Sequence, residues 1–138
     1  MNKMLLVVAM GLGMVGCKND APRAVPAAAD RAGEVSIDEF AASIASGACT
    51  PVDANGEPTR KKFGVIPGAV LLTDYETYTA AELPSDKSKQ LVFYCANEQC
   101  GASHKAAQKA IVAGYTNVRV LPAGVLGWKN AGKQLQTL

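Results

Sequence analysis

Two cysteines that lie five residues apart, Cys95 and Cys100, are the residues of this chain best suited to covalent chemistry. Cys95 directly follows the apolar run Leu91–Tyr94, which is typical of a strand that is buried on both faces. A stretch rich in helix-forming residues begins at Ala102. We therefore expect Cys95 at the carboxyl end of a strand and before a helix, where open α/β sheets bind ligands.

Such a position favours a reactive thiolate. Loop amides and the first turn of a helix offer unpaired N–H groups and a partial positive charge. Both lower the pKa of a nearby thiol, and the thiolate is the form that attacks an electrophile. The same groups would stabilise a persulfide or a bound anion. The sequence thus predicts that Cys95 is a nucleophile.

Cys100 leaves two interpretations open. If the loop curls, the Cα atoms of Cys95 and Cys100 could come within the roughly 4.4–6.8 Å that a disulfide requires. Cys100 would then resolve a persulfide or sulfenate on Cys95, or close a reversible switch. The alternative is that Cys100 is a small loop residue without a chemical role.

The composition disfavours other chemistry. Zinc sites usually need two close pairs of ligands, whereas this chain has four cysteines with one wide pair and a single histidine, His104. We expect no metal and no cofactor. The formal net charge is +2 without a concentrated basic face, so nucleic acid is not an expected partner. The short basic run Arg60–Lys62 is interpreted as a solvated loop.

Local patterns predict the elements that position Cys95. Ser36 and Glu39 form a capping box that begins a helix ending near Ser46. The other expected elements are turns at 55–58 and 67–68, strands over 50–53, 69–72, 91–94 and 118–121, a helical turn over 79–83, and helices over 102–113 and 127–131. The alternation of strands and helices predicts a single α/β domain with a mainly parallel central sheet flanked by helices.

The N-terminal residues are expected to direct export. Lys3 precedes an apolar run that is too short to span a bilayer. The run ends in Met14-Val15-Gly16-Cys17, which resembles the lipobox of bacterial lipoproteins. The resemblance implies that residues 1–16 are a signal peptide and that Cys17 carries acyl chains such as palmitate. An ordinary secretory signal with an incidental Cys17 is the alternative.

An anchor at Cys17 would hold the domain to a membrane without a spanning helix. Residues 17–33 are rich in Ala and Pro and are interpreted as a tether, and residues 34–138 as the folded domain. The resemblance implies a lipid-anchored protein of the bacterial cell envelope that faces the periplasm. By resemblance to lipoprotein sorting in enteric bacteria, Lys18 directly after Cys17 would favour the outer over the inner membrane.

Several segments, in their order along the chain, are similar to motifs of the rhodanese-like domain family. These are Leu91–Tyr94 with Cys95, Gly64-Val65-Ile66-Pro67-Gly68-Ala69, Gly114-Tyr115-Thr116-Asn117-Val118, Pro122–Trp128 with Ala131-Gly132, and the early strand that ends in Val52-Asp53. The resemblance covers roughly residues 33–138. It implies the fold of that family and a sulfurtransferase activity.

The family resemblance implies a two-step covalent reaction. Cys95 would attack the outer sulfur of a donor such as thiosulfate, become a persulfide, and pass the sulfur to cyanide or a thiol. Asp53 and Ser103 would support the site, although Asp53 could equally cap a turn. The partners would be this small donor and acceptor, and the protein would be a monomer. The residues expected to cradle the sulfur are Ala96, Asn97, Glu98, Gln99, Cys100, Gly101 and Ala102.

Departures from the family pattern bear on these expectations. The loop after Cys95 is longer than the common one, lacks Arg and Lys, and carries Glu98, which would repel an anionic donor. Asn55 stands where many members have an Arg, and Gly101 stands where related phosphatases need one, which argues against a phosphatase. Two rival functions stay open. One is a thiol–disulfide redox protein that uses Cys95 and Cys100, and the other is a non-catalytic binding module, against which the presence of Cys95 argues.

Overall fold

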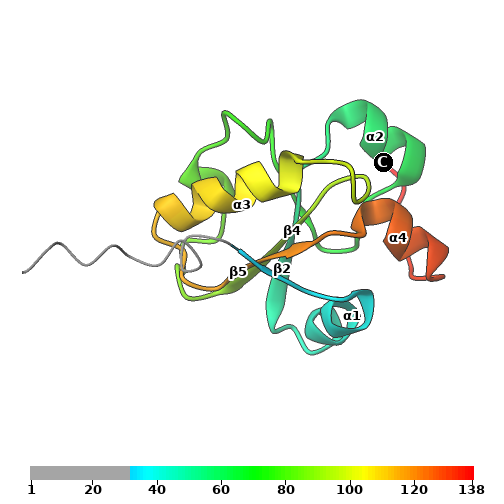
Figure 1. Cartoon of the computed structure of the whole chain (residues 1–138), viewed down its shortest axis with the longest axis horizontal. Coiled ribbons are helices and arrows are strands. Elements are labelled where there is room, and N and C mark those ends of the chain that lie inside the picture. Colours follow the sequence, from blue (N-terminus) through cyan, green and yellow to red (C-terminus); the bar gives the residue numbers. More distant parts are fainter. Residues whose placement is uncertain (1–31) are drawn as a thin grey trace, which may run out of the picture.

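The computed structural model describes residues 32–138 (Figure 1). The signal peptide at 1–16, Cys17 and the tether up to residue 31 lie outside the described residues. The elements in chain order are β1 (Gly33–Glu34), α1 (Ile37–Ala45), β2 (Cys49–Asp53), α2 (Glu57–Phe63), β3 (Val70–Leu71), the 3-10 helix η1 (Ala80–Glu82), β4 (Gln90–Tyr94), α3 (Ala102–Val112), β5 (Val118–Leu121) and α4 (Gly124–Asn130).

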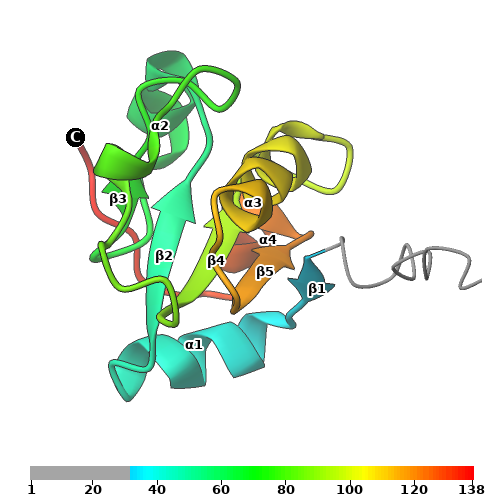
Figure 2. The same ribbon diagram turned by 90° about the vertical axis from the view of Figure 1, so that its left-hand side faces the viewer.

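The described strands form one five-stranded sheet in the order β1-β5-β4-β2-β3, and all neighbours are parallel. Helix α3 packs on one face of the sheet and α1 on the other (Figure 2). Helix α4 belongs to the same apolar cluster as α1, through Val125 and Trp128. The expected α/β domain with a parallel sheet is therefore confirmed. Among the described residues, no helix is long and apolar enough to cross a membrane.

Strand β4 is the centre of both apolar layers. Its side chains alternate: Leu91 and Phe93 belong to the cluster under α3, whereas Val92 and Tyr94 belong to the cluster on the opposite face. All four are at most 1% exposed. Because successive side chains in a strand point to opposite faces, Cys95 continues the alternation on the α3 side. The expected doubly buried strand is confirmed, and it delivers Cys95 to the N-terminal end of α3.

Most of the elements expected from local patterns are present. Ser36 caps α1, since its Oγ accepts a hydrogen bond from the N–H of Glu39 at 3.2 Å, and the Glu39 carboxylate accepts one from the N–H of Ser36 at 2.9 Å. The last helix, α4, begins at Gly124, three residues before its expected start. Strand β1 was not predicted, because two residues carry no periodic signal and it is defined only by its pairing with β5.

Two local predictions are wrong. The segment 55–58 was expected to be a turn and Arg60–Lys62 a solvated loop, but both contribute to helix α2. Gly56 is the N-cap of this helix, and Pro58 lies in its first turn, where the backbone N–H that proline lacks would have no partner within the helix. Glu57 adds a negative charge that is favourable at a helix N-terminus. Arg60 is not solvated: it is 9% exposed. The basic run therefore contains one buried side chain, that of Arg60, and two exposed ones, those of Lys61 and Lys62.

Candidate functional site

The site lies at the carboxyl edge of the sheet. The register pairs Asp53 with Tyr94 and Tyr94 with Leu121, so β2, β4 and β5 end side by side. Cys95 follows Tyr94 directly and is 1% exposed. The residues that leave these strand ends therefore meet around Cys95, as expected for ligand sites of parallel sheets.

The start of the Cys95 loop is held by α4. The N–H of Val125 donates to the carbonyl of Cys95 at 2.8 Å, and the N–H of Leu126 donates to the carbonyl of Ala96 at 3.0 Å. Gly124 allows this approach, because a Cβ atom there would lie 2.5 Å from the carbonyl carbon and oxygen of Ala96. The first turn of α4 thus fixes the direction in which the loop leaves β4.

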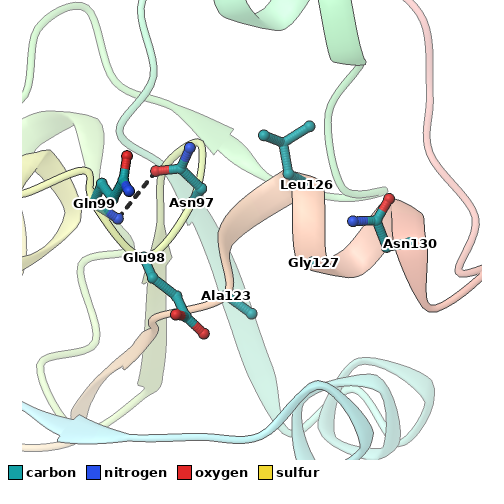
Figure 3. A pocket seen from close by; sticks show the side chains of 7 residues that line it. All are labelled: Asn97, Glu98, Gln99, Ala123, Leu126, Gly127 and Asn130. Atoms are coloured by element: carbon teal, nitrogen blue, oxygen red, sulfur yellow. Dashed lines mark hydrogen bonds between the residues drawn. The ribbon is translucent and has the colours of Figure 1, made fainter.

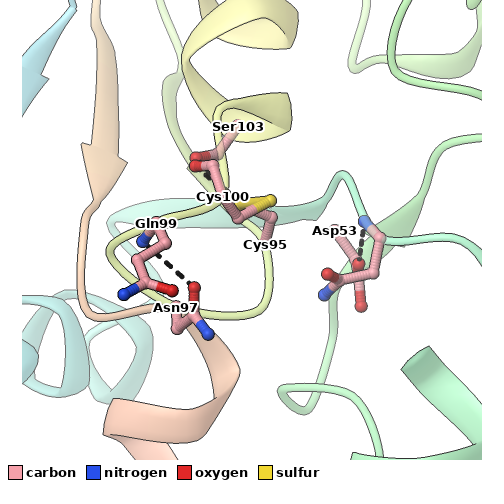
Figure 4. The surroundings of a disulfide bond; sticks show 7 residues. Asp53, Cys95, Asn97, Gln99, Cys100 and Ser103 are labelled. Atoms are coloured by element: carbon pink, nitrogen blue, oxygen red, sulfur yellow. Dashed lines mark hydrogen bonds between the residues drawn. A yellow bond between two sulfur atoms is a disulfide. The ribbon is translucent and has the colours of Figure 1, made fainter.

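A disulfide joins Cys95 to Cys100, with their Cα atoms 6.3 Å apart (Figure 4). The Sγ atom of Cys95 also lies 3.4 Å from Oγ of Ser103, on the first turn of α3, and 3.2 Å from the carbonyl oxygen of Cys100. Ser103 is 2% exposed, whereas Cys100 is only half-buried. Cys95 is therefore the inner sulfur of the pair, and Cys100 is the one nearer to solvent.

The loop amides divide into two groups. In the middle of the loop, Asn97 accepts the N–H of Gln99 on its side-chain oxygen at 3.0 Å and the N–H of Cys100 on its carbonyl at 3.1 Å. These two amides are thus occupied within the loop rather than directed at the sulfur of Cys95. Gly101 is the N-cap of α3 and supplies no capping side chain, so the N–H groups of the first turn remain for an anion beside Cys95.

Behind the site, Asp53 is fully buried at the end of β2. Its Oδ1 accepts the N–H of Asn55 at 2.7 Å, and its Oδ2 accepts the hydroxyl of Tyr94 at 2.9 Å. The Tyr94 oxygen in turn accepts the N–H of Ile66 at 3.0 Å. Asp53 therefore caps the turn after β2, as one of the two interpretations of this residue held, and its hydrogen bonds among the described residues do not reach the Cys95 loop.

Arg60 is the site residue that the sequence reasoning missed. Its Nη2 donates to the carbonyls of Asp53 at 3.0 Å and Leu72 at 2.8 Å. Its Nε lies 3.5 Å from Oδ1 of Asp53, which is an ion-pair distance without a hydrogen bond. The sequence did contain a signal for a helix with an inward-facing Arg60. Pro58 stands where proline is common in a first helical turn, and Arg60 lies about one turn before the apolar Phe63, on the same side of such a helix.

Burial and the contacts among Asp53, Tyr94 and Arg60 shift the pKa values of Asp53 and Tyr94. Burial raises the pKa of Asp53, and the hydrogen bonds from Asn55 and Tyr94 and the charge of Arg60 oppose this rise. Burial and the charge of Asp53 raise the pKa of Tyr94 above its usual range, so its hydroxyl stays protonated and donates to Asp53. The network thus ties α2 and the segment around Ile66 to the strand that carries Cys95.

A cavity of about 380 Å³ lies between the Cys95 loop and α4 (Figure 3). It is lined by Asn97, Glu98, Gln99, Ala123, Leu126, Gly127 and Asn130. Glu98 is the one charged residue of this lining, and Cys95 itself does not line the cavity. The expected loop residues Asn97 to Gln99 therefore face α4, while the two cysteines face α3. The lining is rich in side-chain amides and contains no cation.

His104 does not belong to this cavity. It lines a separate cavity of about 350 Å³ together with Ala32, Glu34 and Gln108. Among residues 32–138, no three His, Cys, Asp or Glu side chains gather in a way that could hold a metal ion. The polar groups beside Sγ of Cys95 are Cys100, the hydroxyl of Ser103 and the N-terminal turn of α3.

The comparisons with known proteins agree with this architecture. In sequence, residues 36–131 match the Rhodanese-like domain family. Among curated proteins, none matches the chain in sequence. In structure, the chain is similar to a Bacillus halodurans protein, with a TM-score of 0.68 and 22% identity over 77% of this chain and 77% of that one.

Two of the similar structures are sulfurtransferases by name. One is the human single-domain sulfurtransferase, with a TM-score of 0.59 and 23% identity over 72% of this chain and 96% of that one. The other is a thiosulfate sulfurtransferase from Pseudomonas aeruginosa, with a TM-score of 0.64 and 24% identity over 77% of this chain and only 20% of that one. At these identities the likeness shows a shared fold.

Proposed function

The chain belongs to the rhodanese-like domain family, and we propose on this basis that it is a sulfurtransferase that carries sulfur as a persulfide on Cys95. One observation carries the proposal: Cys95 stands at the end of β4 against the uncapped first turn of α3. A helix N-terminus stabilises a thiolate before the reaction and a persulfide anion after it. A non-catalytic binding module would not need a nucleophile at this point.

The reaction has two steps. The thiolate of Cys95 attacks the outer sulfur of thiosulfate, the sulfur–sulfur bond of the donor breaks, and sulfite leaves with the electron pair. An acceptor thiolate or cyanide then attacks the outer sulfur of the persulfide, and Cys95 is regenerated as a thiolate. The N–H groups of the first turn of α3 bear the negative charge in both states. Ser103, 3.4 Å from Sγ of Cys95, adds a hydroxyl that can donate to the same charge.

The mass of the intact protein tests this proposal. The test protein is the full chain with Cys17→Ser in mild detergent, so that neither a thiol nor an acyl chain at position 17 changes the mass. After full reduction, removal of the reductant and addition of thiosulfate without oxygen, we expect sulfite release by this chain and, where Cys100 is also replaced by Ser, a gain of the mass of one sulfur atom, and both should depend on Cys95. Cys95→Ser is expected to abolish both. Sulfite release that persists in Cys95→Ser would refute the proposal.

The charge of Glu98 is expected to slow the reaction with thiosulfate. Glu98 is exposed three residues after Cys95, and thiosulfate is a dianion, so the proposed donor would be repelled by this carboxylate as it comes near the loop. Glu98→Gln removes the repulsion and Glu98→Lys replaces it by attraction, so the second-order rate of sulfur loading should rise in the order Glu, Gln, Lys. The total gain is roughly severalfold, on the order of 1 kcal/mol, at low ionic strength.

Stopped-flow measurements of sulfite release would follow this series. Added salt should compress the differences, because screening weakens interactions between exposed charges. Rates that are equal for the three side chains, or a difference that salt leaves unchanged, would contradict the electrostatic explanation.

A second candidate function is thiol–disulfide exchange. It is favoured by the disulfide between Cys95 and Cys100, because a pair with one buried and one half-exposed sulfur resembles the arrangement in which an external thiol attacks the outer sulfur first. Sulfur loading and disulfide exchange differ in their need for Cys100. Only the second activity requires both cysteines.

A further inference from the structure

Cys100 is placed to react with whatever sulfur chemistry occurs on Cys95. The two Sγ atoms are joined in the structure, so no part of the loop has to rearrange for Cys100 to reach Sγ of Cys95. The loop curls because the N–H of Cys100 donates to the carbonyl of Asn97 at 3.1 Å. A second bond, from the N–H of Gln99 to the side chain of Asn97, closes the same turn at 3.0 Å. The loop therefore holds Cys100 over Cys95.

We propose that Cys100 is a second catalytic residue, which attacks the persulfide on Cys95 and releases the transferred sulfur as hydrosulfide. This inference rests on the proposed function, since it needs a persulfide on Cys95. In this reaction the protein releases the transferred sulfur in reduced form and needs no external sulfur acceptor. The donor sulfur would be reduced by the two cysteines themselves.

The step balances. Sγ of Cys100 forms a bond to Sγ of Cys95, and the bond between Sγ of Cys95 and the outer sulfur breaks with its electron pair going to the outer sulfur. The proton of the Cys100 thiol ends on that sulfur, which leaves as hydrosulfide. Counted over both steps, from the two cysteine thiols and the outer sulfur of the donor, the cysteines lose two electrons in forming the disulfide, and the transferred sulfur gains the same two electrons.

The geometry favours attack on the inner sulfur. The atom that the structure joins to Cys100 is Sγ of Cys95, the sulfur attached to Cβ. Attack on the outer sulfur would only move the persulfide from Cys95 to Cys100, and no disulfide would form. The two routes therefore leave different products on the protein, which a mass measurement separates.

A reduced dithiol is the co-reactant that would complete a cycle. One of its thiolates attacks Sγ of Cys100, Cys95 leaves as a thiolate, and the second thiolate of the reductant releases Cys100. Attack at Cys100 is favoured because this residue is half-buried, whereas Cys95 is 1% exposed. The leaving thiolate of Cys95 is the one that the first turn of α3 stabilises.

The test adds thiosulfate to the reduced full chain with Cys17→Ser, under argon and without free reductant. We expect the protein with both cysteines to lose two hydrogens and to release sulfite and hydrosulfide in equal amounts. In Cys100→Ser, we expect the mass of one sulfur atom to be gained on Cys95, sulfite to be released, and hydrosulfide to be absent. Peptide mapping would place the disulfide and the added sulfur.

Cys49→Ala is the matched control. Cys49 is 7% exposed on the far end of β2, and burial raises the pKa of its thiol, so this variant should behave as the protein with both reactive cysteines does. A second control omits thiosulfate, and no disulfide should form in it.

The failures are distinguishable. If the protein with both cysteines keeps the added sulfur as Cys100→Ser does, and no hydrosulfide appears, the role of Cys100 is overturned while the sulfurtransferase proposal stands. A disulfide that forms equally without thiosulfate would also overturn it. If neither protein gains sulfur or releases sulfite, the proposed function fails, and the role of Cys100 falls with it.

Discussion

Replacing Arg60 by Met is expected to lower the free energy of unfolding by about 3–5 kcal/mol, because it leaves a buried carboxylate without its cation. Asp53 is fully buried, and its carbonyl and that of Leu72 would also lose the donor that Nη2 of Arg60 supplies. Met has a similar length and is apolar, so the loss of packing is small. Urea unfolding followed by the fluorescence of Trp128, which is 4% exposed, would measure the change.

The matched control is Lys61→Met on the same helix. Lys61 pairs with Glu57 one turn earlier, but its side chain is 66% exposed, so we expect a change within about 0.5 kcal/mol. Equal destabilisation by the two substitutions would show that helix α2, and not the buried ion pair, explains the loss.

The loss in Arg60→Met should also depend on pH. Burial raises the pKa of Asp53, and without Arg60 one of the opposing influences disappears. The folded variant then holds a proton that the unfolded chain releases, so its stability falls as the pH rises through the folded pKa. The difference between variant and parent should be smaller at pH 5 than at pH 8, and a difference that is independent of pH would argue against a charged Asp53.

Gly124→Ala is expected to disturb both stability and the reactive loop. Gly124 has φ of +63°, and a Cβ atom there would lie 2.5 Å from the carbonyl of Ala96 and 2.7 Å from the N atom of Asn97. The strained backbone costs about 1–2 kcal/mol and the overlap about 1–3 kcal/mol more. Since the atoms that must move follow Cys95 directly, sulfur loading should fall on the order of 100-fold.

Gly132→Ala isolates the backbone part of this effect. Gly132 has φ of +72°, but a Cβ atom there would meet nothing within 4 Å. This variant should lose only about 1–2 kcal/mol of stability and keep the rate of sulfur loading. If Gly124→Ala loads sulfur as fast as Gly132→Ala does, the contact between α4 and the loop does not position Cys95.

Some features of this protein could be predicted because their signals are local. The apolar run before Cys95 identified a strand buried on both faces, and the capping box of Ser36 and Glu39 placed the start of α1. Both signals come from residues within one or two turns of each other, where periodicity and side-chain chemistry act without help from the rest of the chain. The order of strands and helices then restricted the fold to a parallel sheet, whose carboxyl edge holds Cys95.

The burial of Arg60 was not predicted from local patterns. The side chain of a basic run can be buried only where a carboxylate and carbonyl oxygens from distant segments compensate for its charge, and here Asp53 at the end of β2 and Leu72 directly after β3 supply them.

The environment of Cys95 was likewise decided only by tertiary structure. The sequence placed Cys95 between a strand and a helix, and a resemblance suggested its chemistry. It left open whether Cys100 curls back, which depends on the turn that Asn97 closes and on Gly124 letting α4 approach Ala96. The periodic burial of apolar side chains can be predicted from neighbouring residues. The burial of a charge and the closure of a loop depend on residues that are distant in the sequence and that only folding brings together.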